Sequence, residues 1–181
     1  MACNLSRGRK EACKESVGGI KEIYFADFDT LGSVTLTDDE VTDASGTFSA
    51  YKYELKSTGN TFEQTINSNR DNGTTFYDQT LTINLKKLTK EDHKEVKLLA
   101  HGRPHIFVVD NNGNVFLVGK EHGADVTGGT ISTGGALGDL NGYTLTFTAQ
   151  EKLSANFVAG ATDIDPFAGL SSATVTVVEG T

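Results

Sequence analysis

The chain has 181 residues, 37% of them hydrophobic and 22% charged, which predicts one folded domain and argues against a disordered chain. With 16 basic and 24 acidic residues the net charge is −8, so the overall field repels phosphate and argues against a nucleic-acid-binding surface. The sequence has no apolar stretch long enough to span a membrane, and residues 1–14 lack the apolar centre of a signal peptide. We therefore expect synthesis in a cytoplasm and no membrane partner.

Residues 1–16 are expected to form a polar N-terminal arm. Its basic residues are Arg7, Arg9, Lys10 and Lys14. Glu11 interrupts this cluster, and such a mixed run of charges is typical of a solvated segment. The only two thiols, Cys3 and Cys13, match neither a zinc-finger spacing nor a redox CxxC motif. Free thiols are expected in a cytoplasm, and a disulfide only if the protein reaches an oxidising space.

The first predicted strand, residues 20–28, is apolar on both faces. Ile23 and Phe25 point to one side and Tyr24 points to the other. Such a strand is either buried on both sides or packed against a neighbouring subunit. Because two apolar faces exceed what one small core usually needs, we predict self-association through this strand, with Phe25 at the interface.

Short polar segments separate the next predicted strands. Residues 33–37 are expected to form a short strand, 38–46 an exposed acidic loop, and 47–56 a longer strand. A Thr-Gly-Asn turn within 57–60 then predicts a hairpin to the strand at 61–67.

The most regular alternation of the chain lies at 77–85, where apolar side chains alternate with Asp, Thr and Asn. One face of this strand should meet a core, and the other should meet water or a partner. A single amphipathic helix is predicted at about 89–101. Thr89 can cap its start, with Asp92 three residues on, and Gly102 ends it.

The second half of the chain is predicted to contain strands and one long loop. Residues 105–110 and 114–119 are joined by Asn-Asn-Gly and form a hairpin. Seven glycines within 123–142 indicate a flexible connector, which we expect to be mobile in the isolated subunit and ordered on assembly. A strand is predicted at 143–149, where apolar residues alternate regularly with Thr. Residues 173–178 form a terminal strand that pairs within the domain or with a neighbour.

The predicted architecture is mainly β, with one amphipathic α-helix packed on a sheet. Three parts are expected along the chain: the N-terminal arm 1–16, a β-rich domain 17–158, and a C-terminal extension 159–181 that carries the terminal strand.

No catalytic, cofactor-binding or metal-binding residues are predicted, so we expect the chain not to be an enzyme. The histidines are His93, His101, His105 and His122. The spacing of His101 and His105 suits a metal ion only if both lie on one helix, and Gly102 and Pro104 interrupt such a helix. No Ser lies in a GxSxG elbow, and neither Cys has a nearby His to act as its base.

Two loops of the chain resemble ligand-binding motifs only in part. The positions of Asp110, Asn112, Asn114 and Glu121 imitate those of a calcium-binding loop. That loop needs Gly where this chain has Val115, so the same residues are interpreted as a hairpin turn. The glycine-rich stretch 134–138 lacks the Lys-Ser/Thr pair of a nucleotide-binding loop.

Three stretches, 16–26, 73–85 and 141–148, resemble tail tube proteins of tailed bacteriophages. They read SVGGIKEIYFA, GTTFYDQTLTINL and NGYTLTFT. The resemblance runs in order from about residue 3 to about residue 157. More broadly, the chain is similar to phage virion structural proteins of this size.

The resemblance implies a β-sandwich or partly closed β-barrel with one flanking amphipathic α-helix at about 89–101. It also implies a subunit that forms hexameric rings, which stack into a tube with an inner sheet lining a channel for the genome. It also implies that loops and terminal arms join adjacent subunits or rings. The implied partners are copies of the chain and other phage tail proteins, with DNA passing through the channel without specific binding. The implied location is the virion, after synthesis in the cytoplasm of a bacterial host, and the tail type stays open.

Several alternatives remain at the level of sequence. The chain could be a capsid decoration, head–tail joining or adhesion module, or the tube subunit of a contractile injection system. From another class, it could be a ligand-binding β-barrel or a hydrolase with an acidic dyad. A ligand binder should stay monomeric with a concave apolar pocket, whereas a tube subunit should expose strand edges and arms.

Overall fold

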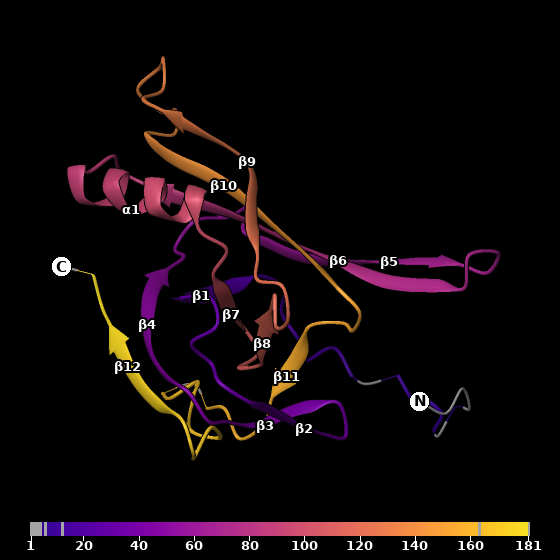
Figure 1. The fold of residues 1–181 in the computed structure, drawn as a ribbon. Helices are drawn as coiled ribbons and strands as arrows, with labels where there is room; N and C mark the ends of the chain where they lie inside the picture. The colour runs from indigo at the N-terminus through magenta and orange to yellow at the C-terminus, as the bar shows by residue number, and fades with distance from the viewer. Residues whose placement is uncertain (1–4, 6, 12, 163, 181) are drawn as a thin grey trace.

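The computed structural model describes residues 5, 7–11, 13–162 and 164–180. These residues form two β-sheets and one α-helix (Figure 1). The larger sheet has the strand order β12-β4-β1-β7-β8-β11-β3-β2. Its members are β1 (Ile20–Ala26), β2 (Val34–Thr37), β3 (Glu40–Ala44), β4 (Thr47–Glu54), β7 (His105–Asp110), β8 (Val115–Val118), β11 (Asn156–Val158) and β12 (Thr174–Val178).

The smaller sheet has the order β5-β6-β10-β9 and is antiparallel throughout. Its members are β5 (Thr61–Asn69), β6 (Thr74–Lys86), β9 (Asp125–Ser132) and β10 (Gly142–Glu151). The hairpin of β5 and β6 extends well beyond the rest of the domain (Figure 1). Two sheets with a single helix confirm the mainly β fold class.

The helix α1 (Lys90–His101) begins and ends where the sequence predicts. The Thr89 hydroxyl accepts a hydrogen bond from the Asp92 amide at 3.0 Å, and the amide of Gly102 donates to the Leu98 carbonyl. Val96 is the buried residue of the helix, and it joins the core between the two sheets. The amphipathic pattern thus directs one face of α1 onto the sheets.

Strand β1 is the element on which the two hydrophobic cores meet. Ile23 and Phe25 belong to the core that faces the smaller sheet, with Leu81 and Phe147. The alternate side chains, including Tyr24, face a second core on the opposite side of the larger sheet. That second core also contains Phe48, Phe107, Phe167 and Leu170.

The prediction that Phe25 lies at a subunit interface is therefore wrong. Its side chain is 2% exposed, and its ring lies 5.1 Å from Tyr53 and 5.2 Å from Phe147, centroid to centroid. The two-sided apolar pattern arises because one strand serves two cores of the same subunit. Hydrophobic alternation does not reveal whether the atoms covering a face come from the same chain or from a neighbour.

Two expectations for the first third of the chain are also corrected. Residues 38–46 are not a loop: Asp38 and Asp39 form a two-residue turn with positive φ, and β3 follows with Val41 buried. The segment 57–60 does not make a hairpin between β4 and β5, because these strands lie in different sheets. Asn60 instead accepts a hydrogen bond from the Asn84 amide and carries the chain from one sheet to the other.

The glycine-rich segment is also more ordered than predicted, because it contains β9, the edge strand next to β10. A Cβ atom on Gly129 would lie only 2.5 Å from the carbonyl oxygen of Thr144. Glycine here allows two backbones to approach closely, and its presence does not by itself indicate mobility. The connector expected over 123–142 shrinks to the loop at 133–141.

The C-terminal strand β12 pairs within the domain, parallel to β4, from Thr174 opposite Thr47 to Val178 opposite Tyr51. Phe167 and Leu170, in the preceding loop, are buried in the second core. The segment after residue 158 thus contributes both a strand and core side chains to the larger sheet.

Truncation of Phe25 should destabilise the subunit itself. For Phe25→Ala we expect a loss of about 3–5 kcal/mol in the free energy of unfolding, because the substitution leaves a cavity between the sheets. Chemical denaturation measures this loss, with Ile66→Ala as the control, since Ile66 is 65% exposed. An unchanged midpoint for Phe25→Ala would place this side chain outside the core.

Hydrogen exchange should separate β9 from the loop that follows it. In the isolated subunit we expect slower exchange for the amides of 125–132 that face β10 than for those of 133–141, because only the former are bonded in a ladder. Mass spectrometry of overlapping peptides provides the readout. Equally fast exchange in both segments would restore the interpretation of the whole stretch as a mobile connector.

Candidate functional site

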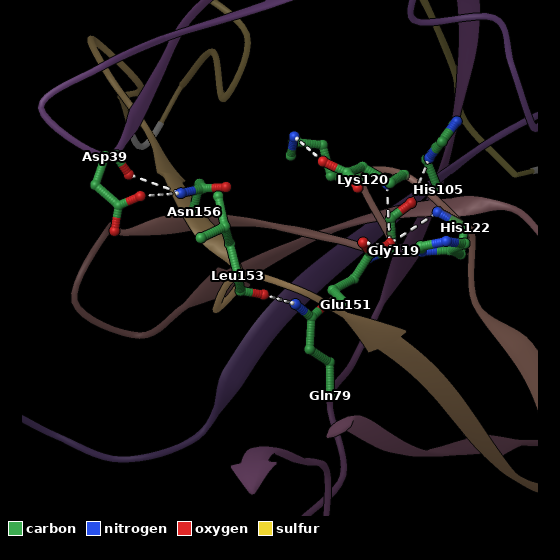
Figure 2. Close-up of polar contacts among 10 residues, drawn as sticks. Asp39, Gln79, His105, Gly119, Lys120, His122, Glu151, Leu153 and Asn156 are labelled. Carbon is green, nitrogen blue, oxygen red and sulfur yellow. Dashed lines mark hydrogen bonds and ion pairs between the residues drawn. The ribbon is translucent and has the colours of Figure 1, made fainter. Parts of the chain in front are cut away.

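The densest group of buried polar side chains surrounds the loop 119–123, between β8 and β9 (Figure 2). Three side chains from three different strands converge on this loop: Gln79 of β6, His105 of β7 and Glu151 of β10. Their exposed fractions are between 1% and 4%. Because buried polar atoms need partners, their bonds define what this site can do.

The Glu151 side chain holds the loop by accepting hydrogen bonds from the backbone of the loop. Its Oε1 accepts hydrogen bonds from the amides of Glu121 at 2.9 Å and His122 at 2.8 Å. Its Oε2 lies 3.2 Å from Nδ1 of His122. A carboxylate that accepts two amide hydrogen bonds works as a clamp on the loop.

Gln79 connects the smaller sheet to two loops. Its Oε1 accepts a hydrogen bond from the Gly119 amide at 3.0 Å, and its Nε2 donates to the Leu153 carbonyl at 3.2 Å. Nearby, Nδ2 of Asn156 donates to the carbonyl and side-chain oxygens of Asp39, tying β11 to the turn between β2 and β3 (Figure 2). Each amide therefore bridges segments that are distant in sequence.

His105 is held as a neutral ring. Its Nδ1 lies 2.7 Å from the Gly119 carbonyl, which can only accept, and its Nε2 accepts from the Asp29 amide at 3.1 Å. These partners require a protonated Nδ1 and an unprotonated Nε2. Burial accordingly lowers the pKa of His105, even though the Gly119 carbonyl favours the charged form. The ring also stacks on Phe28, with centroids 5.2 Å apart.

One group of side chains here has the composition of a metal site. Ligand atoms of Glu121, His122 and Glu151 lie within 4.8 Å of one another. The Glu151 oxygens already bond to the loop, however, and the Glu121 carboxylate pairs with Lys120 at 3.0 Å. The hydrogen bond and positive charge of Lys120 lower the pKa of Glu121. This arrangement accounts for all three residues as a clamped loop without an ion.

The histidines and the Asp110 loop, whose spacing in the sequence partly resembles that of ligand sites, have ordinary structural roles. His101 is exposed at the end of α1 and His105 is buried in β7, so the structure does not bring them together as a pair. Asp110 accepts hydrogen bonds from the amides of Asn112 and Asn114, both at 2.8 Å, which confirms the hairpin-turn interpretation. Burial opposes ionisation of Asp110, but these hydrogen bonds outweigh it and lower the pKa.

The residues that sequence analysis missed are Gln79 and Glu151. Both sit at inward positions of otherwise apolar alternations, Gln79 two residues before Leu81 and Glu151 two residues after Ala149. A polar residue on an apolar face was the available signal, because such a residue must find a buried partner.

A second feature is the outer face of the smaller sheet. On the strands β5, β6 and β10 this face carries Phe76 and Lys86, and its other side chains are polar: Thr61, Glu63, Thr65, Asn67, Asn69, Thr74, Asp78, Thr80, Thr82, Asn84, Thr144, Thr146, Thr148 and Gln150. They bond across strands, as from Thr144 to Asn84 and from Gln150 to Asp78, both at 2.8 Å. Within the four strands, all of them described, Lys86 at the end of β6 is the sole cation.

Comparison with family models, curated proteins and solved structures finds no match to this chain. The resemblance to tail tube proteins therefore stays a prediction. Within the described residues, no helix has the length and apolar character needed to cross a membrane.

The neutral state of His105 predicts how stability depends on pH. The unfolded chain protonates this ring near pH 6.5, whereas the folded chain resists protonation until a lower pH. This contribution to the free energy of unfolding should be fully present above pH ~6.5. It should fall as the pH drops toward the folded pKa, by at most about 1.4 kcal/mol per pH unit.

Denaturation between about pH 8 and pH 5 measures this dependence. His105→Gln should flatten it, and the control His93→Gln should not, since His93 is exposed. Identical pH profiles for wild type and His105→Gln would mean that this ring does not control acid sensitivity.

Proposed function

We propose that this chain is a structural subunit of a bacteriophage tail tube, which assembles into stacked hexameric rings that form a conduit for genome delivery. The observation that carries the proposal is the smaller sheet, which combines an outer face nearly free of cations with two open edges. The subunit would act in the virion with copies of itself and other tail proteins, after synthesis in the host cytoplasm.

The open edges support self-association. Strands β5 and β9 each pair with one neighbour only in the described structure. Natural edge strands are commonly protected by Lys, Pro or short length, yet β5 has nine residues and neither Lys nor Pro. Joining β5 of one copy to β9 of the next would continue the same sheet around a ring.

The overhang of the β5–β6 hairpin supports the same conclusion. Ile66 is 65% exposed and Phe76 is 38% exposed, although both lie in strands. The hairpin projects away from the domain (Figure 1). Ile66 lies on the inner face of the hairpin and is open to a neighbour there, whereas Phe76 lies on the outer face, opposite Asn67. Exposed apolar groups beside an open edge are typical of association surfaces.

The chemistry of the outer face supports a conduit for DNA. Hydroxyl, amide and carboxylate groups dominate the face. Phosphate contacts from Lys and Arg supply most nonspecific affinity for DNA, so a lining with few of them holds the duplex weakly. In a ring closed through β5 and β9, this face would form one continuous surface toward the channel.

Electron microscopy of negatively stained protein tests the assembly. We expect rings or tubes from the wild-type chain as its concentration rises, and their loss in Ile66→Lys, because a charge next to the edge opposes strand pairing. Ile164→Lys is the matched control, since Ile164 is 96% exposed in the loop before β12. A wild-type chain that stays monomeric, or rings from Ile66→Lys, would contradict the proposed assembly.

The same particles allow a test of the conduit. We expect no appreciable affinity for duplex DNA at physiological salt, with or without residues 1–14. A salt series distinguishes the outcomes, because binding that survives loss of the arm and falls steeply with salt would require a basic channel.

A further inference from the structure

A groove runs between α1 and the edge of the larger sheet formed by β4 and β12. Two adjoining cavities of about 680 and 520 Å³ make up the groove, and both are lined by Tyr51, Tyr53 and Glu95. In Figure 1, α1 lies near the upper end of β4, and the C-terminal segment ends nearby. The groove is therefore built from three segments that are distant in sequence.

The groove combines an apolar wall with an acidic rim. Leu98, 58% exposed, and Tyr51, 39% exposed, present apolar surface to it. Five carboxylates line the larger cavity: Glu54, Glu91, Asp92, Glu95 and Glu179. The basic lining residues are Lys52 in the larger cavity and Arg103 in the smaller one, where the Arg103 guanidinium lies 4.0 Å from the centre of the Phe28 ring. The lysines of α1 line neither cavity.

Part of this negative charge is not neutralised. Glu54 pairs with Lys56, and Glu179 pairs with Lys52. No ion pair within the described chain involves Glu91 or Glu95.

The negative charge of these carboxylates affects the ionisation of Tyr53, which lines the groove. The pKa of Tyr53 is raised to about 12, first by burial and then by the charges of Glu95 and Asp92. An occupant of this groove should therefore be cationic and carry some apolar surface.

The N-terminal arm has that chemistry. Between residues 5 and 16 it carries four basic residues and two acidic ones. All of its described residues are exposed, and Leu5 is 99% exposed. Val17, where the arm joins the domain, is held on the turn between β7 and β8 by hydrogen bonds of 2.9 and 2.8 Å with Asn112.

We propose that the arm of one copy docks in the groove between α1 and β4 of a second copy, with its basic side chains on Glu91 and Glu95. This inference rests on the proposed self-assembly and names one of its contacts. One feature favours a second copy over the same chain: the arm lies across the molecule from α1 (Figure 1). Subunits of net charge −8 repel one another, so assembly needs contacts in which a local positive segment meets a negative one.

A pair of charge reversals tests the docking. The arm variant is Arg7→Glu with Arg9→Glu, and the groove variant is Glu91→Lys with Glu95→Lys, all at exposed positions. Each variant alone presents like charges on arm and groove, so we expect its self-association to be at least about tenfold weaker than wild type. Circular dichroism checks that each variant is folded.

Mixing the two variants distinguishes a second copy from the same chain. In a 1:1 mixture the reversed arm meets the reversed groove, and the wild-type arm meets the wild-type groove. Sedimentation velocity should then show association restored to within a few-fold of wild type. If only a chain carrying all four reversals is restored, the arm occupies its own groove and the proposal is overturned.

A disulfide trap gives an independent measurement that does not alter the charges. Cys13 is exposed in the arm, and Leu98→Cys places a partner in the groove, in a background of Cys3→Ser. We expect oxidation to give covalent dimers and longer ladders, at least about tenfold more than the matched control Ile164→Cys. Monomers with an internal disulfide, or equal dimer yields in the control, would overturn the proposal.

The two proposals fail in different ways. If the wild-type chain does not associate, the tail tube function fails and the docking fails with it. If rings form equally well from the wild type and from both reversed variants, only the docking fails.

Discussion

Burial of β1 on both of its faces is the constraint on which the rest of this structure depends. The strand pairs with β4 on one side and β7 on the other, so its backbone is bonded within the sheet. Its side chains divide between two cores, and each core recruits a different part of the chain. The smaller sheet and α1 close one core, while Phe167 and Leu170 close the other. One seven-residue strand thereby holds together segments from both ends of the domain.

The buried polar side chains do a complementary task, because they fix loops that hydrophobic packing leaves undetermined. Gln79, His105 and Glu151 all bond to the backbone of one short loop, from three different strands. None of the described side chains leaves a fully buried polar atom without a partner. A network satisfied in this way defines a single loop conformation, since each alternative would leave a buried group unpaired.

The proposed function depends on surfaces that the fold leaves open. The smaller sheet ends in two open edges, and the groove beside α1 keeps unneutralised carboxylates next to apolar surface. Both features are unfavourable in a permanent monomer and reasonable in a subunit of an assembly. In the proposed assembly, the basic arm and the acidic groove would let a protein of strongly negative net charge attract copies of itself through local charge separation.

The sequence by itself determined the mainly β class, the helix with its Thr89 cap and the hairpin after Asp110, because capping, turn chemistry and alternation act over a few residues. It could not determine which chain covers Phe25, which sheet receives the strand after Asn60, or that Gly129 lies in an edge strand. Nor could it show that Glu151 meets the loop before β9. Those outcomes depend on contacts between segments distant in the chain, so only the tertiary structure decided them.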